Sequence, residues 1–368
     1  MSKEEHSGAI LTVDLTAIAA NWKLLRDRLG SATCSGVVKA DAYGLGAEAV
    51  GKTLAAAGCE VFVVAHLDEG LRLRSALPDA EIHVLNGAPP KTEPEFAAHR
   101  LIPVLNGLGD IERWRRFCAG KGEPLPADVH VDTGMSRLGL PPAEIDLLAA
   151  EPQRLSGIAP RYLISHLACA DEPGHPMNGE QLAAFRRAHE RLPLAEASFA
   201  NSSGIFLGAD YHFDMARPGI ALYGGNPVPE KPNPMAQVVR LQGKILQVRD
   251  VDTPQTVGYG ATYRISRPTR IATVSVGYAD GFLRSLGNSG SAFIGDVEAP
   301  IVGRVSMDLT TLDVSAVPEA ECLPGGLVDL IGPHNPIDAV ADRAGTISYE
   351  ILTDLGPRYH RVYTGGAA

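Results

Sequence analysis

Cysteine is scarce in this sequence, and its thiols are far apart. The five cysteines, Cys34, Cys59, Cys118, Cys169 and Cys322, are odd in number and form no C-x-x-C pair. This spacing argues against a disulfide framework and a zinc site, and the histidines do not fall at metal-ligand spacing either, so we expect no metal. Reduced thiols are typical of cytoplasmic proteins, and a cytoplasmic location is expected.

The sequence also lacks the features by which proteins bind membranes and nucleic acids. No apolar run approaches the ~18 residues needed to cross a bilayer. The N-terminal stretch MSKEEHSGAILTVDL has no apolar core of a signal peptide. The formal net charge of −10 does not favour nucleic acid or anionic lipid. With 368 residues, 45% of them hydrophobic and 21% charged, the chain is long enough for two globular domains.

The first part of the chain alternates short apolar runs with amphipathic stretches. Strand-like runs such as VFVVAH, IHVLNG and LIPVL are separated by helix-like segments such as AEAVGKTLAAAG and LDEGLRLRSAL. Branched apolar runs between helices are typical of parallel strands that are covered on both faces. About eight such units predict a (β/α)8 barrel of the TIM type, with a doubly wound open sheet as the second choice.

The pattern changes near Pro227. The stretch NPVPEKPNP has four prolines in nine residues and cannot form regular structure. After it the sequence is rich in strands and turns, and a helical pattern returns only around ISYEILTDLG. We therefore expect a barrel over residues 10–235 and a mostly β domain over residues 236–368. The first strand, at about residues 8–15, could join either unit.

The segment VVKADAYGLGA places Lys39 at the end of an apolar strand. Barrels of this type form their active sites at the carboxyl ends of the strands, so Lys39 is a candidate for the site. A lysine in a partly desolvated site has a lowered pKa and can attack a carbonyl carbon. Most lysines are solvent-exposed, however, and Lys39 alone does not decide the function.

Further polar residues follow the next predicted strands. Arg137 comes after DVHVD and a Thr-Gly turn, and it could hold a carboxylate or a phenolic oxygen, or lie on the surface. His166 ends a strand in LISHLACADE, where a structural role is more common than a catalytic one. Asn201 and Ser202, in ANSSG, could cap a helix or bind a phosphate at its N-terminus.

Three motifs nearer the C-terminus complete the set. In ARPGIALYGG, Arg217 precedes Pro218–Ile220, whose backbone could approach a phosphate closely. In VGYGATY, Tyr259 is flanked by glycines that leave its ring accessible; the alternative is a packed tyrosine in a hairpin turn. The last two candidates are Met307 in GRVSMDLT and Tyr349 in ISYEILTDLG.

No single motif is decisive, but their order resembles that of the alanine racemase family. The motifs VVKADAYG, VDTGMSRLG, SHLACADE, ANSSG, ARPGIALYG, VGYGATY, GYADG, VGRVSMD and ISYEIL occur with the family's spacing, from about residue 10 to 363. The resemblance implies an isomerase that uses pyridoxal 5'-phosphate to interconvert L- and D-alanine, supplying D-alanine for peptidoglycan or degrading it. It also implies a homodimer whose active sites are shared between the subunits.

The resemblance assigns a role to each motif residue. Lys39 would carry the cofactor, and Lys39 and Tyr259 would be the two catalytic bases. Arg137 and Met307 would bind the substrate, with Tyr259 and Met307 provided by the partner subunit. The remaining residues would bind the cofactor: His166 and Arg217 near its pyridine nitrogen, Tyr43, Ser202, Gly219, Ile220 and Tyr349 around its phosphate, and Asn201 as a further cofactor-binding residue.

The implied chemistry is consistent with these residue types. A racemase removes the α-proton from one face of its substrate and returns it to the other, which an amine and a phenol on opposite sides can do.

One position departs from the family. Many members have a carbamylated lysine seven residues before the arginine of the DTGM-x-R motif, whereas this chain has His130. What positions Arg137 is therefore open, and a bound anion or another carboxylate could replace the carbamate.

Three alternatives remain open at this stage. The chain could be a racemase of broader amino-acid specificity. It could instead be a non-catalytic protein that binds pyridoxal phosphate, although barrels of that kind lack a second β domain. A basic amino-acid decarboxylase of the same general fold is less favoured. The sequence does not distinguish a biosynthetic from a catabolic racemase.

Overall fold

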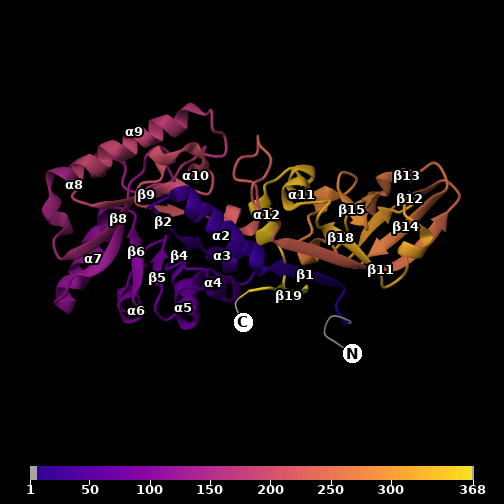
Figure 1. The fold of residues 1–368 in the computed structure, drawn as a ribbon, viewed down its shortest axis with the longest axis horizontal. Coiled ribbons are helices and arrows are strands. Elements are labelled where there is room, and N and C mark those ends of the chain that lie inside the picture. The colour runs from indigo at the N-terminus through magenta and orange to yellow at the C-terminus, as the bar shows by residue number, and fades with distance from the viewer. Residues whose placement is uncertain (1–5, 367–368) are drawn as a thin grey trace.

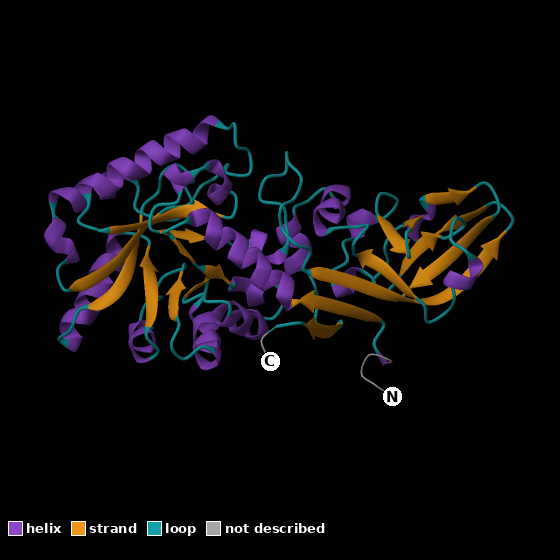
Figure 2. Ribbon diagram, viewed as in Figure 1, coloured by secondary structure: helices purple, strands orange, loops and turns teal. Residues whose placement is uncertain are grey.

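The computed structural model describes residues 6–366 as two units that lie side by side along the long axis of the molecule (Figure 1). Residues 1–5, which belong to the segment without signal-peptide features, and residues 367–368, at the end of the expected β domain, lie outside the described residues. Helices surround the sheet of one unit, whereas strands dominate the other (Figure 2). Within the described residues, no helix is long and apolar enough to span a membrane.

Parallel strands and surrounding helices form the first unit. The strands are β2 (Thr33–Cys34), β3 (Gly36–Val37), β4 (Val61–Val64), β5 (Glu81–Val84), β6 (Leu101–Leu105), β7 (Leu125–His130), β8 (Ile158–Ile164), β9 (Glu196–Asn201) and β10 (Met215–Arg217). The helices are α2 (Leu15–Leu29), α3 (Lys39–Tyr43), α4 (Ala47–Ala56), α5 (Leu67–Ala76), α6 (Glu93–Ala98), α7 (Leu108–Lys121), α8 (Pro142–Ala150), α9 (Pro176–Arg191) and α10 (Gly204–Leu207).

The barrel closes through one short segment of chain. The nine strands run in the order β2-β10-β9-β8-β7-β6-β5-β4-β3, and only Ser35 separates β2 from β3. Residues 33–37 therefore act as one interrupted strand, which pairs with β10 on one side and β4 on the other. Counted in this way, the sheet has the eight strands of a (β/α)8 barrel, which confirms the predicted fold class and excludes an open sheet.

Helix α2 packs on the barrel strands through side chains that the sequence places at its start and on one of its faces. Asp14 caps its first turn by accepting a hydrogen bond from the backbone N–H of Ala17 at 2.9 Å. The helix buries one face, including Ile18 and Trp22, against the barrel. The indole N–H of Trp22 donates to the carbonyl oxygen of Cys34 at 3.1 Å, so a buried polar group is satisfied where α2 packs on β2.

The second unit consists of a mostly antiparallel eight-stranded sheet and a separate antiparallel pair of strands. Its strands are β11 (Val239–Val251), β12 (Gln255–Val257), β13 (Tyr263–Ile265), β14 (Thr269–Val274), β15 (Ser291–Ile294), β16 (Val297–Pro300), β17 (Thr310–Asp313), β18 (Leu327–Ile331) and β19 (His360–Thr364), with helices α11 (Ile337–Ala344) and α12 (Ser348–Thr353). The N-terminal strand β1 (Ala9–Asp14) belongs to the eight-stranded sheet, antiparallel to β11 and parallel to β19, whereas β12 and β13 form the separate pair.

Two elements were not among those expected from the pattern. Helix α11 begins after Pro336, ends at Gly345 and buries Ile337, Val340 and Ala341 at helical spacing. Its start and stop residues are ordinary helix signals, but eight residues are easily missed in a strand-rich region. Strand β10 has only three residues, all buried, which is too short to show any periodicity.

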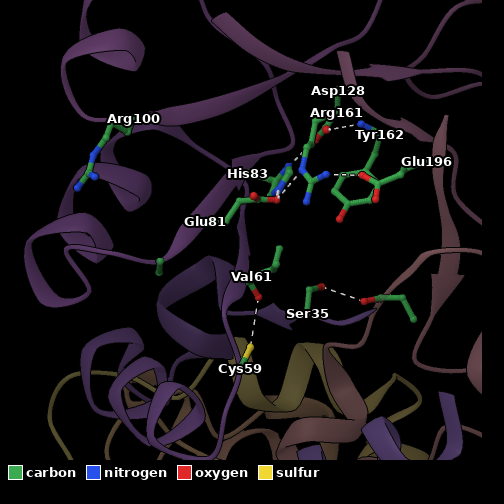
Figure 3. A network of polar contacts seen from close by, with 12 residues as sticks. Ser35, Cys59, Val61, Glu81, His83, Arg100, Asp128, Arg161, Tyr162 and Glu196 are labelled. Carbon is green, nitrogen blue, oxygen red and sulfur yellow. Dashed lines mark hydrogen bonds and ion pairs between the residues drawn. The ribbon is translucent and has the colours of Figure 1, made fainter. Parts of the chain in front are cut away.

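A polar network at the amino end of the barrel has a buried centre, His83 and Asp128, and a partly exposed rim (Figure 3). The ring nitrogens of His83 contact Asp128 at 2.6 Å and Glu81 at 2.9 Å. Glu81 also pairs with Arg161, which in turn pairs with Glu196. Burial alone would lower the pKa of His83, but its charge attraction and hydrogen bonds to Asp128 and Glu81 raise the pKa to about 9.

The raised pKa of His83 predicts a loss of stability at alkaline pH. A group whose pKa is raised on folding contributes its stability fully below the unfolded pKa, near 6.5, and loses it as the pH rises through about 9. We expect the free energy of unfolding to fall by on the order of 2 kcal/mol between pH 7 and 10 from this group.

Denaturant unfolding of the wild type and of His83→Gln, measured at several pH values, tests this expectation. The variant should be less stable at pH 7, and the difference between the two proteins should shrink toward pH 10. A difference that is independent of pH would show that His83 is not charged in the folded protein.

Candidate active site

A cavity of about 790 Å³ lies at the carboxyl ends of the barrel strands, where α12 of the second unit covers it. Ten of the twelve residues nominated from the sequence line this one space: Lys39, Tyr43, Arg137, His166, Asn201, Ser202, Arg217, Gly219, Ile220 and Tyr349. His130 lines it too. A second cavity, of about 800 Å³, lies at the amino end of the barrel and contains none of these residues.

Lys39 enters the cavity at the start of an unusual turn. Residues 40–43 all have φ between 52° and 55°, which is the left-handed region, and none is glycine. Such a conformation costs roughly 1–2 kcal/mol per residue, so neighbouring contacts must hold it. Glu69 accepts from the backbone N–H of Ala40 at 2.6 Å, and Asp41 accepts from that of Ala47 at 2.8 Å. The turn places Lys39 and Tyr43 in the same cavity.

The electrostatic environment of Lys39 favours its neutral form. Burial lowers the pKa of its ammonium group, and repulsion from Arg137 and Arg217 adds to the effect, while Glu69 opposes it. An amine with a lowered pKa is available as a nucleophile and as a base nearer neutral pH.

Arg217 places a buried cation beside neutral hydrogen-bond acceptors. Its guanidinium donates to the hydroxyl of Ser198 and to the carbonyl oxygen of Ser165, each at 2.5 Å, and lies 3.5 Å from Nδ1 of His166. Burial lowers the pKa of Arg217 to about 10, which leaves it charged at neutral pH. Burial and the charge of Arg217 hold the pKa of His166 well below its usual value, so this ring is neutral and can accept.

A group of hydrogen-bond donors lies around Ser202. The Ser202 hydroxyl accepts from the backbone N–H groups of Gly219 at 2.9 Å and Ala221 at 3.3 Å. A side chain at position 219 would come within 2.3 Å of the Tyr43 hydroxyl, so glycine is needed for this close approach. Burial raises the pKa of Tyr43, and that of Tyr349 to about 12, and both phenols remain donors. Hydroxyls and backbone N–H groups of this kind suit a phosphate.

Tyr259 and Met307 are not brought into this cavity. Tyr259 lies in a turn between β12 and β13, with Gly258 and Gly260 at φ 71° and 72° on either side, and its side chain is 71% exposed. Met307 is 54% exposed, in the loop before β17. Within one chain the structure therefore separates these two residues from Lys39.

Several residues that support the site were missed by the sequence reasoning. Glu69 holds the turn after Lys39, Ser198 accepts from Arg217, and Asn106 contacts Nδ1 of His130 at 2.7 Å. Asn106 directly follows β6, so its place at a strand end was a signal that could have nominated it. Ser198 lies inside β9 and gave no such signal.

The cavity joins an amine of lowered pKa, donors suited to a phosphate and a buried arginine at the mouth of a (β/α)8 barrel. This set fits pyridoxal phosphate, which has a carbonyl group, a phosphate and a ring nitrogen, and it defines the class of barrel enzymes that use this cofactor. Residues 13–227 match the alanine racemase N-terminal domain, and residues 238–363 match the alanine racemase C-terminal domain. The chain belongs to the alanine racemase family.

Similar proteins extend this finding over the whole chain. An alanine racemase of Rhodospirillum rubrum is 57% identical, covering 99% of this chain and 98% of its own length. A catabolic alanine racemase of Mesorhizobium japonicum is 50% identical, covering 99% and 95%. The crystal structure of alanine racemase from Bartonella henselae, with covalently bound pyridoxal phosphate, has a TM-score of 0.94 at 43% identity, covering 97% of this chain and 99% of that one.

The contact between Ser198 and Arg217 predicts a measurable loss of stability. In Ser198→Ala the buried guanidinium loses one acceptor, which should lower the free energy of unfolding by about 1–3 kcal/mol. Denaturant unfolding measures the change. As a control, Ser75→Ala removes an exposed hydroxyl that donates to the Leu71 carbonyl oxygen, and it should change stability by less than about 0.5 kcal/mol. Equal stability of Ser198→Ala and the wild type would contradict the role given to Ser198.

Proposed function

We propose that this protein binds pyridoxal phosphate at Lys39 and interconverts L- and D-alanine. The observation that carries the proposal is the single cavity in which Lys39, Ser202 and Arg217 meet, in a chain of the alanine racemase family. The bound cofactor would supply a carbonyl group for the substrate amine and a ring that draws electrons from the α-carbon.

The residues of the cavity divide the remaining tasks. Lys39 would hold the cofactor, and its lowered pKa favours the neutral amine that can take or return the α-proton. Ser202 and the Gly219 N–H bind the phosphate. Arg217 keeps its own proton because even its lowered pKa, about 10, is far above neutral pH, so it would not give that proton to the ring nitrogen of a bound cofactor. Arg137 receives the carboxylate of the substrate.

A second base is needed on the opposite face, and we assign it to Tyr259 of a partner subunit. The exposure of Tyr259 and Met307, together with their absence from the cavity of their own chain, supports a homodimer in which each β domain completes the other site. Leu138 and Ile347, at the mouth of the cavity, are also exposed apolar residues that a second subunit would cover.

The finer points of the function are proposals of the same kind. We propose a cytoplasmic enzyme, because all five cysteines are free thiols. Similar proteins include a catabolic enzyme and a structure described as biosynthetic, from Pseudomonas aeruginosa at 35% identity and TM-score 0.91, so both roles remain candidates. Assays of the cofactor-loaded protein against each L-amino acid, with chiral detection of the product, will measure substrate breadth.

Lys39 should be the attachment point of the cofactor. Borohydride reduction of the loaded protein, followed by peptide mapping, should place the pyridoxyl group on the peptide that contains Lys39. Lys39→Ala should retain no reducible cofactor, whereas Lys52→Ala, which removes an exposed lysine, should label normally. Label on any other lysine would refute this part of the proposal.

Mixed dimers should show whether Tyr259 acts in the partner's site. Lys39→Ala and Tyr259→Phe homodimers should both be inactive. In a mixed dimer one site carries both changes and the other carries neither. Random pairing makes about half of the dimers mixed, so about a quarter of wild-type activity should return.

The mixed dimer is best made by co-expression with two different tags and isolated by tandem purification. Isolated mixed dimers should then have about half of wild-type activity. A mixed dimer with no more activity than its parents would place Tyr259 in the site of its own subunit and overturn the shared site.

A further inference from the structure

Asn106 fixes which nitrogen of His130 carries the proton. The Asn106 side-chain N–H groups donate to the carbonyl oxygens of Leu85 at 3.1 Å and Val104 at 3.0 Å. The amide oxygen is therefore the atom that contacts Nδ1 of His130, at 2.7 Å. Because an amide oxygen can only accept, Nδ1 must be the protonated nitrogen, and a neutral ring then has its lone pair on Nε2. Rotating the amide would set its oxygen against two carbonyl oxygens.

The loop that contains Arg137 is anchored on His130 itself. The backbone N–H of Leu140 donates to the His130 carbonyl oxygen at 2.8 Å, and that of Asp132 donates to the Leu140 carbonyl oxygen at 2.9 Å. A side chain at Gly139, where φ is 101°, would lie 3.1 Å from Cδ2 of His130. Asn106 thus holds the Nδ1 edge of the ring, while Gly139 of the Arg137 loop approaches Cδ2 on the other edge.

The charges around His130 favour a neutral ring. Burial lowers the pKa of His130 to about 4, and repulsion from Arg217 on β10 and from Arg137 adds to this, while Asp132 opposes it. His166 also lines the space and is neutral. Among residues 6–366, Arg137 forms no ion pair or hydrogen bond, although it lines the cavity with His130.

We propose that His130 is a positioning residue whose neutral imidazole, locked by Asn106, offers Nε2 to the guanidinium of Arg137 and so orients Arg137 toward the substrate carboxylate. An acceptor without charge leaves the full positive charge of Arg137 available to the substrate. The carboxylate part of this proposal rests on the proposed function, whereas the proton position on His130 does not.

The first test reads the proton position directly. Long-range proton–nitrogen correlation spectra of the cofactor-loaded protein, labelled with ¹⁵N-histidine, distinguish a protonated Nδ1 from a protonated Nε2. The His130 signals are those that vanish in His130→Gln. Between pH 6 and 9 we expect a neutral ring protonated at Nδ1, and in Asn106→Leu a mixture of both forms. A charged ring, or a proton fixed on Nε2 in the wild type, would overturn the proposal.

The second test separates positioning from structural support. His130→Phe keeps a flat ring but removes the acceptor, so KM for alanine and the inhibition constant of propionate should both rise about tenfold, with kcat changed less. His130→Gln retains an acceptor and should recover most of the affinity. The control His99→Gln changes an exposed histidine and should match the wild type.

The outcomes distinguish a failure of the proposed racemase function from a failure of the proposed role of His130. Absence of racemase activity in the wild type would refute the proposed function and leave the spectral test of His130 intact. An active wild type in which Phe and Gln at position 130 give the same KM and the same propionate inhibition would refute the role of His130 alone. Should His130→Phe fail to fold, the wild-type spectra still decide the proton position.

Discussion

Burial and the positive charge of Arg217 together lower the pKa of the basic groups around this arginine. Among residues 6–366 no carboxylate pairs with its guanidinium, which is held by the hydroxyl of Ser198, the carbonyl oxygen of Ser165 and Nδ1 of His166. Because the charge is poorly screened inside the barrel, it contributes to the lowered pKa of three neighbours: Lys39, His130 and His166. Burial and this arginine together favour the neutral forms of an amine and two imidazoles, where proton transfer and hydrogen-bond acceptance are needed.

The two ends of the barrel shift the pKa of a histidine in opposite directions. At the amino end, His83 lies between two carboxylates and has a raised pKa. At the carboxyl end, burial lowers the pKa of His130, and the charges of Arg217 and Arg137 lower it further. Asp128 and His130 are only two residues apart on β7, so a single strand connects an anionic interior to a cationic cavity. The sequence VHV gives no indication that its histidine differs from His83.

Sequence reasoning succeeded where a pattern repeats or a strand end exposes a polar residue. The alternating units gave the barrel, and strand-end residues such as Lys39 and Arg137 share its cavity because parallel strands end on one side. It failed where geometry arises from packing. The left-handed turn at residues 40–43 uses alanine, aspartate and tyrosine rather than glycine, and it is held by Glu69 from another helix. A contact between residues so far apart in the chain cannot be recognised from the sequence around the turn.

The pairing of β1 has a consequence for how the chain reaches its native state. Ile10 pairs with Gln242 on one side and with His360 on the other, so the strand made early in synthesis finds its partners only after the whole barrel has been translated. The barrel is, in effect, an insertion within the β sheet. Such non-local pairing is slow to form, and β1 remains an unpaired edge until β11 and β19 have left the ribosome. Synthesis therefore orders the two units: the barrel can form first, and the sheet that begins the chain is completed last.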